Sequence, residues 1–259
     1  MIEYESGPYQ CGFMMIWQGS TYLFAFTIAF PSSLLSFLLK YYEVDEWSLL
    51  EAGGSAAWSG FTFLVGFVIV FRTSQAYSRF WGAINDTHTM LAEWFDASSS
   101  LVAWTKHSTV SIEEVDRFLH LAVRLFSILS ACALQELSDV ENQRVNGLDT
   151  LDVASLDYQT VKTLDEAATQ AQSVELVYQW IQQLLVDGCQ NNIVAVAPPI
   201  VGRTFTELAA GMSKWQDAMK CAKVPFPLPY AQTTTVLLMF HWILCPLAMT
   251  AWTQGAPGA

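Results

Sequence analysis

The sequence is poor in charge. Only 14% of its 259 residues are Asp, Glu, Lys or Arg, whereas a soluble domain carries about 25%. Basic residues are the scarcer kind, with 12 against 24 acidic residues and a net charge of −12. Nucleic acid is therefore not expected as a partner, because phosphate binding needs clustered Lys and Arg. With 53% hydrophobic residues, the composition predicts a membrane protein with a sizeable part outside the lipid.

Signatures of metal and catalytic sites are also missing. The five cysteines lie far apart and form no C-x-x-C pair, so neither a disulfide framework nor a zinc site is expected. The sequence contains no H-E-x-x-H, G-x-S-x-G, Walker A or G-x-G-x-x-G motif. The four His are isolated, and His241 is either a neutral His bonded within a helix bundle or a functional polar group. We predict that the chain is not an enzyme and holds no metal.

Three apolar runs, none of which contains Asp, Glu, Lys or Arg, are long enough to cross a membrane as helices: 22–39, 52–71 and 230–252. Basic residues follow the second run and precede the third, which places the long middle segment on the inside. We expect a multi-pass protein with membrane lipid as a partner. Three spans would leave the C-terminus outside, and its last residues resemble an interrupted loop, so we expect at least one further span.

The middle segment predicts helices alone. Residues 67–134 contain no Pro and a single Gly, so the second span should continue as a long helix beyond the membrane surface. A second helix is expected from about Ser111, and Arg124 within its apolar stripe indicates a buried helix outside the membrane. A third should cover about 156–186 and stop at Gly188. A last interior helix should open at Thr204, after a break at Pro198-Pro199.

The fold class is therefore all-α, a membrane helical bundle that continues into an interior helical domain. The expected organisation is an N-terminal segment with two spans, an interior domain and a third span: 1–71, 72–226 and 227–259. A fourth span is expected but lacking from this sequence.

Aromatic residues form a stripe along the second span. Ser59, Phe63, Phe67 and Phe71 are spaced by four and share one slowly drifting helical face. Composition alone favours packing against a neighbouring helix. Alternatively, several subunits that present this face to a common axis would make an apolar constriction, which can gate by dewetting. In that arrangement Ser59 lies at the outer pore mouth.

Two arginines follow the aromatic stripe in the sequence. Arg72 and Arg79 are seven residues apart, or two turns, on one helical face. They either anchor the span in lipid head groups, or they make the inner side of a pore attractive to anions.

Four sequence motifs resemble those of bestrophins, and their residues are more similar to the bacterial and algal branch than to the animal one. The stretch that begins Phe71-Arg72-Thr73 is similar to the family signature F-R-[TN]-N-x-x-Y-x-R-[FW]-W, with Tyr77, Arg79 and Trp81 at the signature positions and Ser74 where Asn is usual. Residues 17–22 and 197–208 resemble the first span and the helix before the third. The start of the third span, VPFPLPYAQ, also matches the family and contains these residues: Pro225, Phe226, Pro227, Pro229 and Gln232.

The resemblance implies a homopentamer around a central anion pore. The family lines its neck with three apolar residues spaced by four, which here implies Phe63, Phe67 and Phe71. Chloride, and bicarbonate as a second anion, are the expected permeant and bound species. The acidic cluster that binds calcium in animal members follows the fourth span, so this chain does not support calcium binding. An algal plastid or thylakoid membrane and a bacterial inner membrane both fit. The alternative from another class is a non-conducting structural subunit of a larger membrane assembly.

Overall fold

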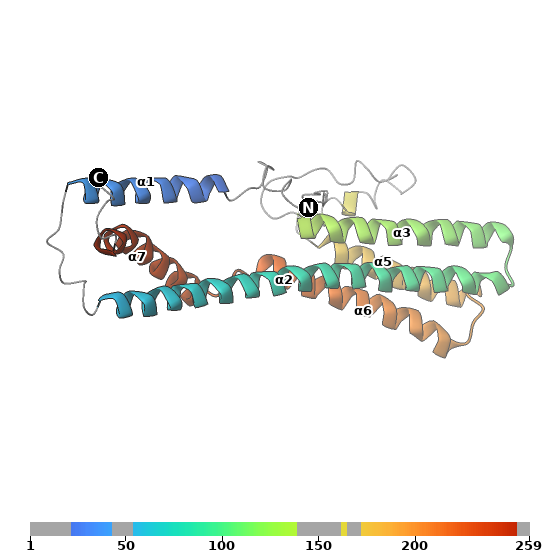
Figure 1. Ribbon diagram of the computed structural model, residues 1–259. Coiled ribbons are helices and arrows are strands. Elements are labelled where there is room, and N and C mark those ends of the chain that lie inside the picture. The colour runs from blue at the N-terminus through green and yellow to red at the C-terminus, as the bar shows by residue number, and fades with distance from the viewer. Residues whose placement is uncertain (1–21, 43–53, 139–161, 165–171, 253–259) are drawn as a thin grey trace, which may run out of the picture. The chain divides into compact units, whose positions relative to one another are not determined.

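The computed structural model describes residues 22–42, 54–138, 162–164 and 172–252 (Figure 1). Within these ranges the chain forms helices and no strand, which confirms the all-α fold class. The elements are α1 (Tyr22–Tyr41), α2 (Gly54–Trp104), the short 3-10 helix η3 (Thr105–His107), α3 (Ile112–Ser138), α5 (Ser173–Gln190), α6 (Pro198–Lys223) and α7 (Leu228–Trp252).

The chain divides into two compact units. The membrane unit comprises residues 1–74 and 226–259, and the interior unit comprises residues 75–225. The polypeptide passes between the units at two points, within α2 and just before α7.

Helix α2 belongs to both units because nothing in its sequence stops it. It runs unbroken for 51 residues, roughly 75 Å at 1.5 Å per residue, as the lack of Pro predicts. Its first half is almost free of charge and its second half is polar on one side. The predicted extension of the second span far beyond a membrane is confirmed.

The membrane unit exposes its apolar side chains. Helices α1 and α7 pack together, yet Phe24 on α1 and Phe63 on α2 are 78% and 77% exposed. Buried residues are few among the described positions of this unit, with Val65, Thr234 and Ala248 below 5% exposure. Apolar helices that leave most of their surface open require lipid or further protein around them.

Four helical stretches are long and apolar enough to cross a membrane, judged by length and composition: Phe24–Tyr41, Ala56–His107, Ile112–Ser138 and Pro198–Thr250. Of these, Ile112–Ser138 stands apart because 44% of its most apolar window is buried, against 17% or less in the others. This helix, α3, lays its apolar face against α5. That packing favours an interior position for α3, and the assignment stays a prediction.

The interior unit has one continuous apolar core. Helix α2 contributes Met90, Trp94, Ala97 and Leu101, and α3, α5 and α6 surround them with aliphatic and aromatic side chains. In Figure 1 the second half of α2 runs alongside these three helices. Burial of this surface, worth about 25 cal/mol per Å², is what holds the interior unit together.

Trp94 and Gly211 bring α2 and α6 into close contact. The indole of Trp94 is 1% exposed, and its Nε1 donates a hydrogen bond to the carbonyl of Leu208 at 3.3 Å. A Cβ added at Gly211 would overlap the indole ring, so only glycine fits there. The missing side chain is thus what allows a tryptophan between the two helices.

Two predicted helix boundaries are wrong. Helix α6 begins at Pro198 instead of Thr204, because proline is well suited to the first turn of a helix, where its missing N–H would have had no partner. Helix α5 continues past Gly188 to Gln190, and the left-handed residue after it is Asn192. Gly188 is needed for packing, since a Cβ there would meet the ring of Phe118. The first part of the helix expected over 156–186 lies largely outside the described residues.

Replacement of Gly211 by alanine tests the packing of α2 on α6. We expect Gly211→Ala to lower the stability of the interior unit by about 1–3 kcal/mol, because overpacking forces the helices apart. Gly202→Ala on the same helix is the matched control, since a Cβ there meets nothing within 4 Å. Thermal unfolding of the purified protein in detergent measures both, and equal midpoints for the two variants would contradict the contact.

Candidate functional site

The aromatic stripe of α2 lies on an open face of the membrane unit. Phe63, Phe67 and Phe71 are 77%, 64% and 42% exposed, and Ser59 on the preceding turn is exposed as well. Because each step of four residues advances about 400° around the helix, the rings follow one another along a face that drifts by about 40°. One copy of the chain therefore presents a row of exposed phenyl rings.

On another side of α2, aromatic residues meet α7. His241 of α7 stacks on Trp58 with ring centroids 5.2 Å apart and lies 6.0 Å from Phe61, while Val65 is buried two turns further on. The imidazole is thus placed between aromatic rings inside the membrane unit. Its Nδ1 is buried and makes no hydrogen bond. Helix α2 thus contacts α7 through Trp58 and Phe61, while Phe63 and Phe67 are exposed.

Phe71 differs from the other two phenylalanines. Its ring lies 6.5 Å from that of Tyr230 at the start of α7, at an interplanar angle of 37°. The contact explains why Phe71 is less exposed than Phe63 and Phe67. It also restrains the ring next to Arg72, which is itself exposed.

The rest of the arginine-containing motif continues along α2. The hydroxyl of Thr73 donates to the carbonyl of Ile69 at 2.9 Å. Tyr77 and Trp81, one turn apart, are 64% and 50% exposed and meet edge to face at 6.1 Å. The part of α2 in the interior unit thus carries exposed aromatic rings near the point where that unit begins.

Arg79 occupies a different environment from Arg72. It is half-buried, and its Nη2 donates to the carbonyls of Cys221 at 2.9 Å and Val224 at 2.5 Å. These carbonyls lie at the end of α6 and at its C-cap residue. The sequence spacing of the two arginines gave no sign of this difference, because the partners are more than 140 residues away.

The prolines and aromatics of the motif before the third span lie around the start of α7. Pro225 and Pro227 stand between α6 and α7, and Pro229 lies in the first turn of α7. Phe226 is half-buried and meets Tyr230 edge to face at 6.1 Å. Gln232 is exposed.

Several cations of the interior unit are paired with acids. Lys214 bonds to Asp86 at 3.0 Å, and Arg203 bridges Asp96 at 3.2 Å and Glu207 at 2.5 Å. The hydrogen bond that Lys214 donates to the Asp86 carboxylate raises the pKa of Lys214 above its ordinary value. Lys220 does the reverse for Asp217, whose carboxylate pKa is lowered by the hydrogen bond between them. These groups hold helices together and leave little unbalanced charge around them.

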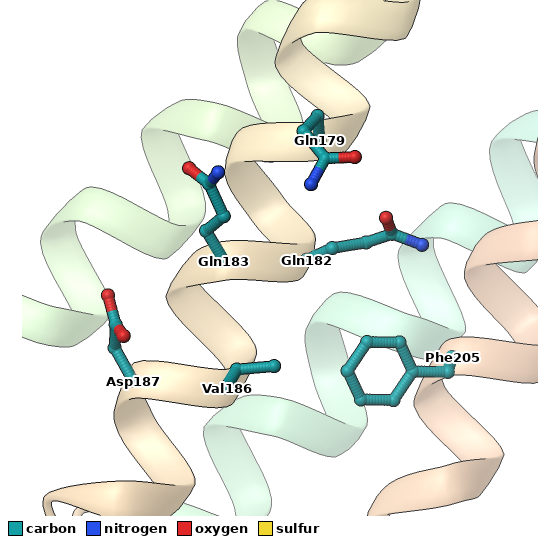
Figure 2. A pocket seen from close by; sticks show the side chains of 6 residues that line it. All are labelled: Gln179, Gln182, Gln183, Val186, Asp187 and Phe205. Carbon is teal, nitrogen blue, oxygen red and sulfur yellow. The ribbon is translucent and has the colours of Figure 1, made fainter.

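An open pocket lies between α5 and α6 in the interior unit. Its volume is about 490 Å³, and its lining consists of Gln179, Gln182, Gln183, Val186, Asp187 and Phe205. Gln182 and Val186 extend from α5 towards Phe205 on α6 (Figure 2). Amides, one carboxylate and two apolar groups make no pair of nucleophile and base, so the pocket offers no catalytic chemistry. Over the described ranges no group of three His, Cys, Asp or Glu is arranged to hold a metal ion.

Comparison with known proteins supplies the family. The family model described as "Bacterial/Fungal Bestrophin protein" matches residues 7–254. No curated protein matches the sequence.

Solved structures agree in fold. A crystal structure of a variant bestrophin homologue from Klebsiella pneumoniae superimposes with a TM-score of 0.71 at 15% identity, covering 90% of this chain and 80% of the other. A second variant from the same organism gives 0.67 at 17% identity, with 90% and 78% covered. A structure described only as a membrane protein gives 0.63 at 17% identity, with 86% and 77% covered. The chain therefore belongs to the bestrophin family, in its bacterial and fungal branch, and is a multi-pass integral membrane protein.

Proposed function

We propose that the chain forms an anion-selective channel, a homopentamer in which five copies of α2 surround the pore and Phe63, Phe67 and Phe71 line its neck. The observation that supports this most directly is the exposure of Phe63 and Phe67, 77% and 64%, on a helix that meets α7 through other side chains, Trp58 and Phe61. An apolar stripe that its own chain leaves uncovered is suited to a shared axis. Membership of the family supports the same arrangement.

The proposed permeation mechanism has two steps. The exposed Arg72 lies directly after the last ring of the neck, and its positive charge would raise the local concentration of anions. The rings then offer no hydrogen-bond donors, so an anion must lose part of its hydration shell to pass. Their positive edges offset a fraction of that cost. Weakly hydrated anions such as iodide or nitrate should pass more readily than chloride, with chloride and bicarbonate as the proposed physiological ions.

Ser59 completes the proposed neck on the outer side. It precedes Phe63 by one turn, and its exposed hydroxyl would face an ion that has not yet been dehydrated. The competing function, a non-conducting structural subunit, requires a partner protein on the same aromatic stripe. The two functions differ in whether the purified chain conducts.

Recording from the purified protein tests the channel directly. In planar bilayers with a chloride gradient we expect single-channel currents that reverse near the chloride equilibrium potential, and native mass measurement should count five copies. A reversal potential near the cation equilibrium value would exclude anion selectivity. Silence from a folded pentamer would favour the structural subunit.

Replacement of the three phenylalanines tests the neck. The triple variant Phe63→Ala, Phe67→Ala and Phe71→Ala should raise unitary conductance several-fold and reduce the preference for iodide over chloride, because a wider neck lets ions keep their water. Phe61→Ala is the matched control, since Phe61 packs on the α7 side of the same helix. It should leave the relative permeabilities unchanged. Wild-type conductance and selectivity in the triple variant would show that the neck lies elsewhere.

A further inference from the structure

The end of α6 lacks backbone donors. In a continuing helix the carbonyl of Cys221 would accept from the N–H of residue 225, and that of Lys223 from residue 227. Both positions are proline, which has no N–H. Pro225 also disfavours a helical conformation at the residue before it, and Val224 is extended, with φ −88° and ψ 112°. The prolines thus stop the helix and leave its last acceptors unpaired by backbone.

Arg79 of α2 supplies the missing donors. Its Nη2 donates to the carbonyls of Cys221 at 2.9 Å and Val224 at 2.5 Å, and the thiol of Cys221 donates to the Arg79 carbonyl at 3.7 Å. A positive charge at the C-terminus of a helix is also favourable to its dipole. One guanidinium therefore does what the N–H of residue 225 would do in an uninterrupted helix, and it adds a bond to the next carbonyl outside the helix.

Arg79 also borders an open, mostly apolar pocket of about 460 Å³, together with Phe80, Ala218, Cys221 and Ala222. Hydrogen bonds from a charged, half-buried group contribute more to stability than those between neutral groups. Arg72 is exposed on the same helix and is the residue of the pair that remains suited to attract anions.

The location of Arg79 gives these bonds a consequence beyond α6. The chain leaves the membrane unit after Ser74 within α2 and returns to it after Pro225. Arg79 lies five residues beyond the first point and bonds to the residue just before the second. The chain passes between the two units at these two points. Within the interior unit, Arg79 therefore links the two segments that lead to the membrane unit.

We propose that Arg79 is a positioning residue that replaces the donor removed by Pro225 and thereby sets the point at which the chain leaves α6 for α7. It acts through the start of α7, and α7 contacts the helix that carries the proposed neck at Trp58 and Phe71. For its effect on currents the inference rests on the proposed channel function. Its effect on the end of α6 is independent of that function.

A double-mutant cycle between Arg79 and Pro225 tests the inference on the full-length protein. Hydrogen exchange at the last turn of α6, including the Val224 amide that bonds to Lys220, is the readout. We expect Arg79→Ala to speed exchange there roughly tenfold or more. Pro225→Ala restores an N–H and releases Val224, so α6 can extend by one residue. In that background Arg79→Ala should change exchange about twofold or less.

Two further variants separate positioning from charge. Arg79→Lys keeps the charge on a shorter side chain that cannot bridge both carbonyls, so its exchange should fall between those of wild type and Arg79→Ala. Arg72→Ala removes the same charge from the same motif and should leave exchange at the end of α6 unchanged. Wild-type exchange in Arg79→Lys would favour a role for charge alone and overturn the proposal.

Currents provide the functional readout. Arg79→Ala should lower the open probability and leave the iodide-to-chloride permeability ratio as in wild type, and Pro225→Ala should restore part of the loss.

An equal effect of Arg79→Ala on hydrogen exchange with and without Pro225 would overturn the inference. If Arg79→Ala does not fold, the cycle is read from the yield of folded protein, where recovery with Pro225→Ala supports the inference and its absence refutes it. A silent wild type in which the exchange cycle holds would contradict the channel and leave the positioning of α6 intact.

Discussion

The structure depends on the continuity of one helix. Helix α2 carries the aromatic stripe in its first half and the core residues Met90 and Trp94 in its second half. Inside a membrane every backbone polar group must be bonded within the chain, and an uninterrupted helix meets that requirement without help. The same regularity keeps residues spaced by four in register. A proline or a glycine-rich break in α2 would uncouple the aromatic stripe from the interior core.

The net charge of −12 does not by itself argue against an anion channel, because a permeating ion responds to the charges nearest to it, and some acids of α2 and α6 are paired. Asp86, Asp96 and Glu207 each lie within ion-pair distance of Lys214 or Arg203. Paired charges act over short distances, and at physiological ionic strength a field fades over about 8 Å. The ions in a pore respond to the groups beside them. In the proposed channel these are the exposed Arg72 and the rings of the neck.

Much of the fold could be predicted from sequence, because it follows from hydrophobic runs and helix-breaking residues. The bounds of α1 and α7 and the start of α2 agree closely with the uncharged runs. The start of α6 was predicted wrongly, because a Pro-Pro pair can either interrupt a helix or occupy its first turn. Gly188 was equally ambiguous, because the sequence does not distinguish a glycine that makes room for the ring of Phe118 from a glycine that ends a helix.

The site was less predictable than the fold. The spacing of Phe63, Phe67 and Phe71 follows from helical periodicity, and their exposure in the structure is compatible with the neck, which remains a prediction. The two roles weighed for Arg79, lipid anchoring and attraction of anions, were both local. Its hydrogen bonds join residues 142 and 145 positions apart, and no local pattern reports such a pairing.

Two of the motifs that resemble the family contact each other in the structure, although they are far apart in sequence. Phe71 and Arg79 belong to the first, and Val224 and Tyr230 to the second. Phe71 meets the ring of Tyr230 in the membrane unit, and Arg79 bonds to the carbonyl of Val224 in the interior unit. Each unit thus has its own contact between α2 and the segment that joins α6 to α7. Because Pro225 and Pro227 lie between these contacts, that segment cannot form a continuous helix, and the side chains of α2 meet it on either side of the prolines.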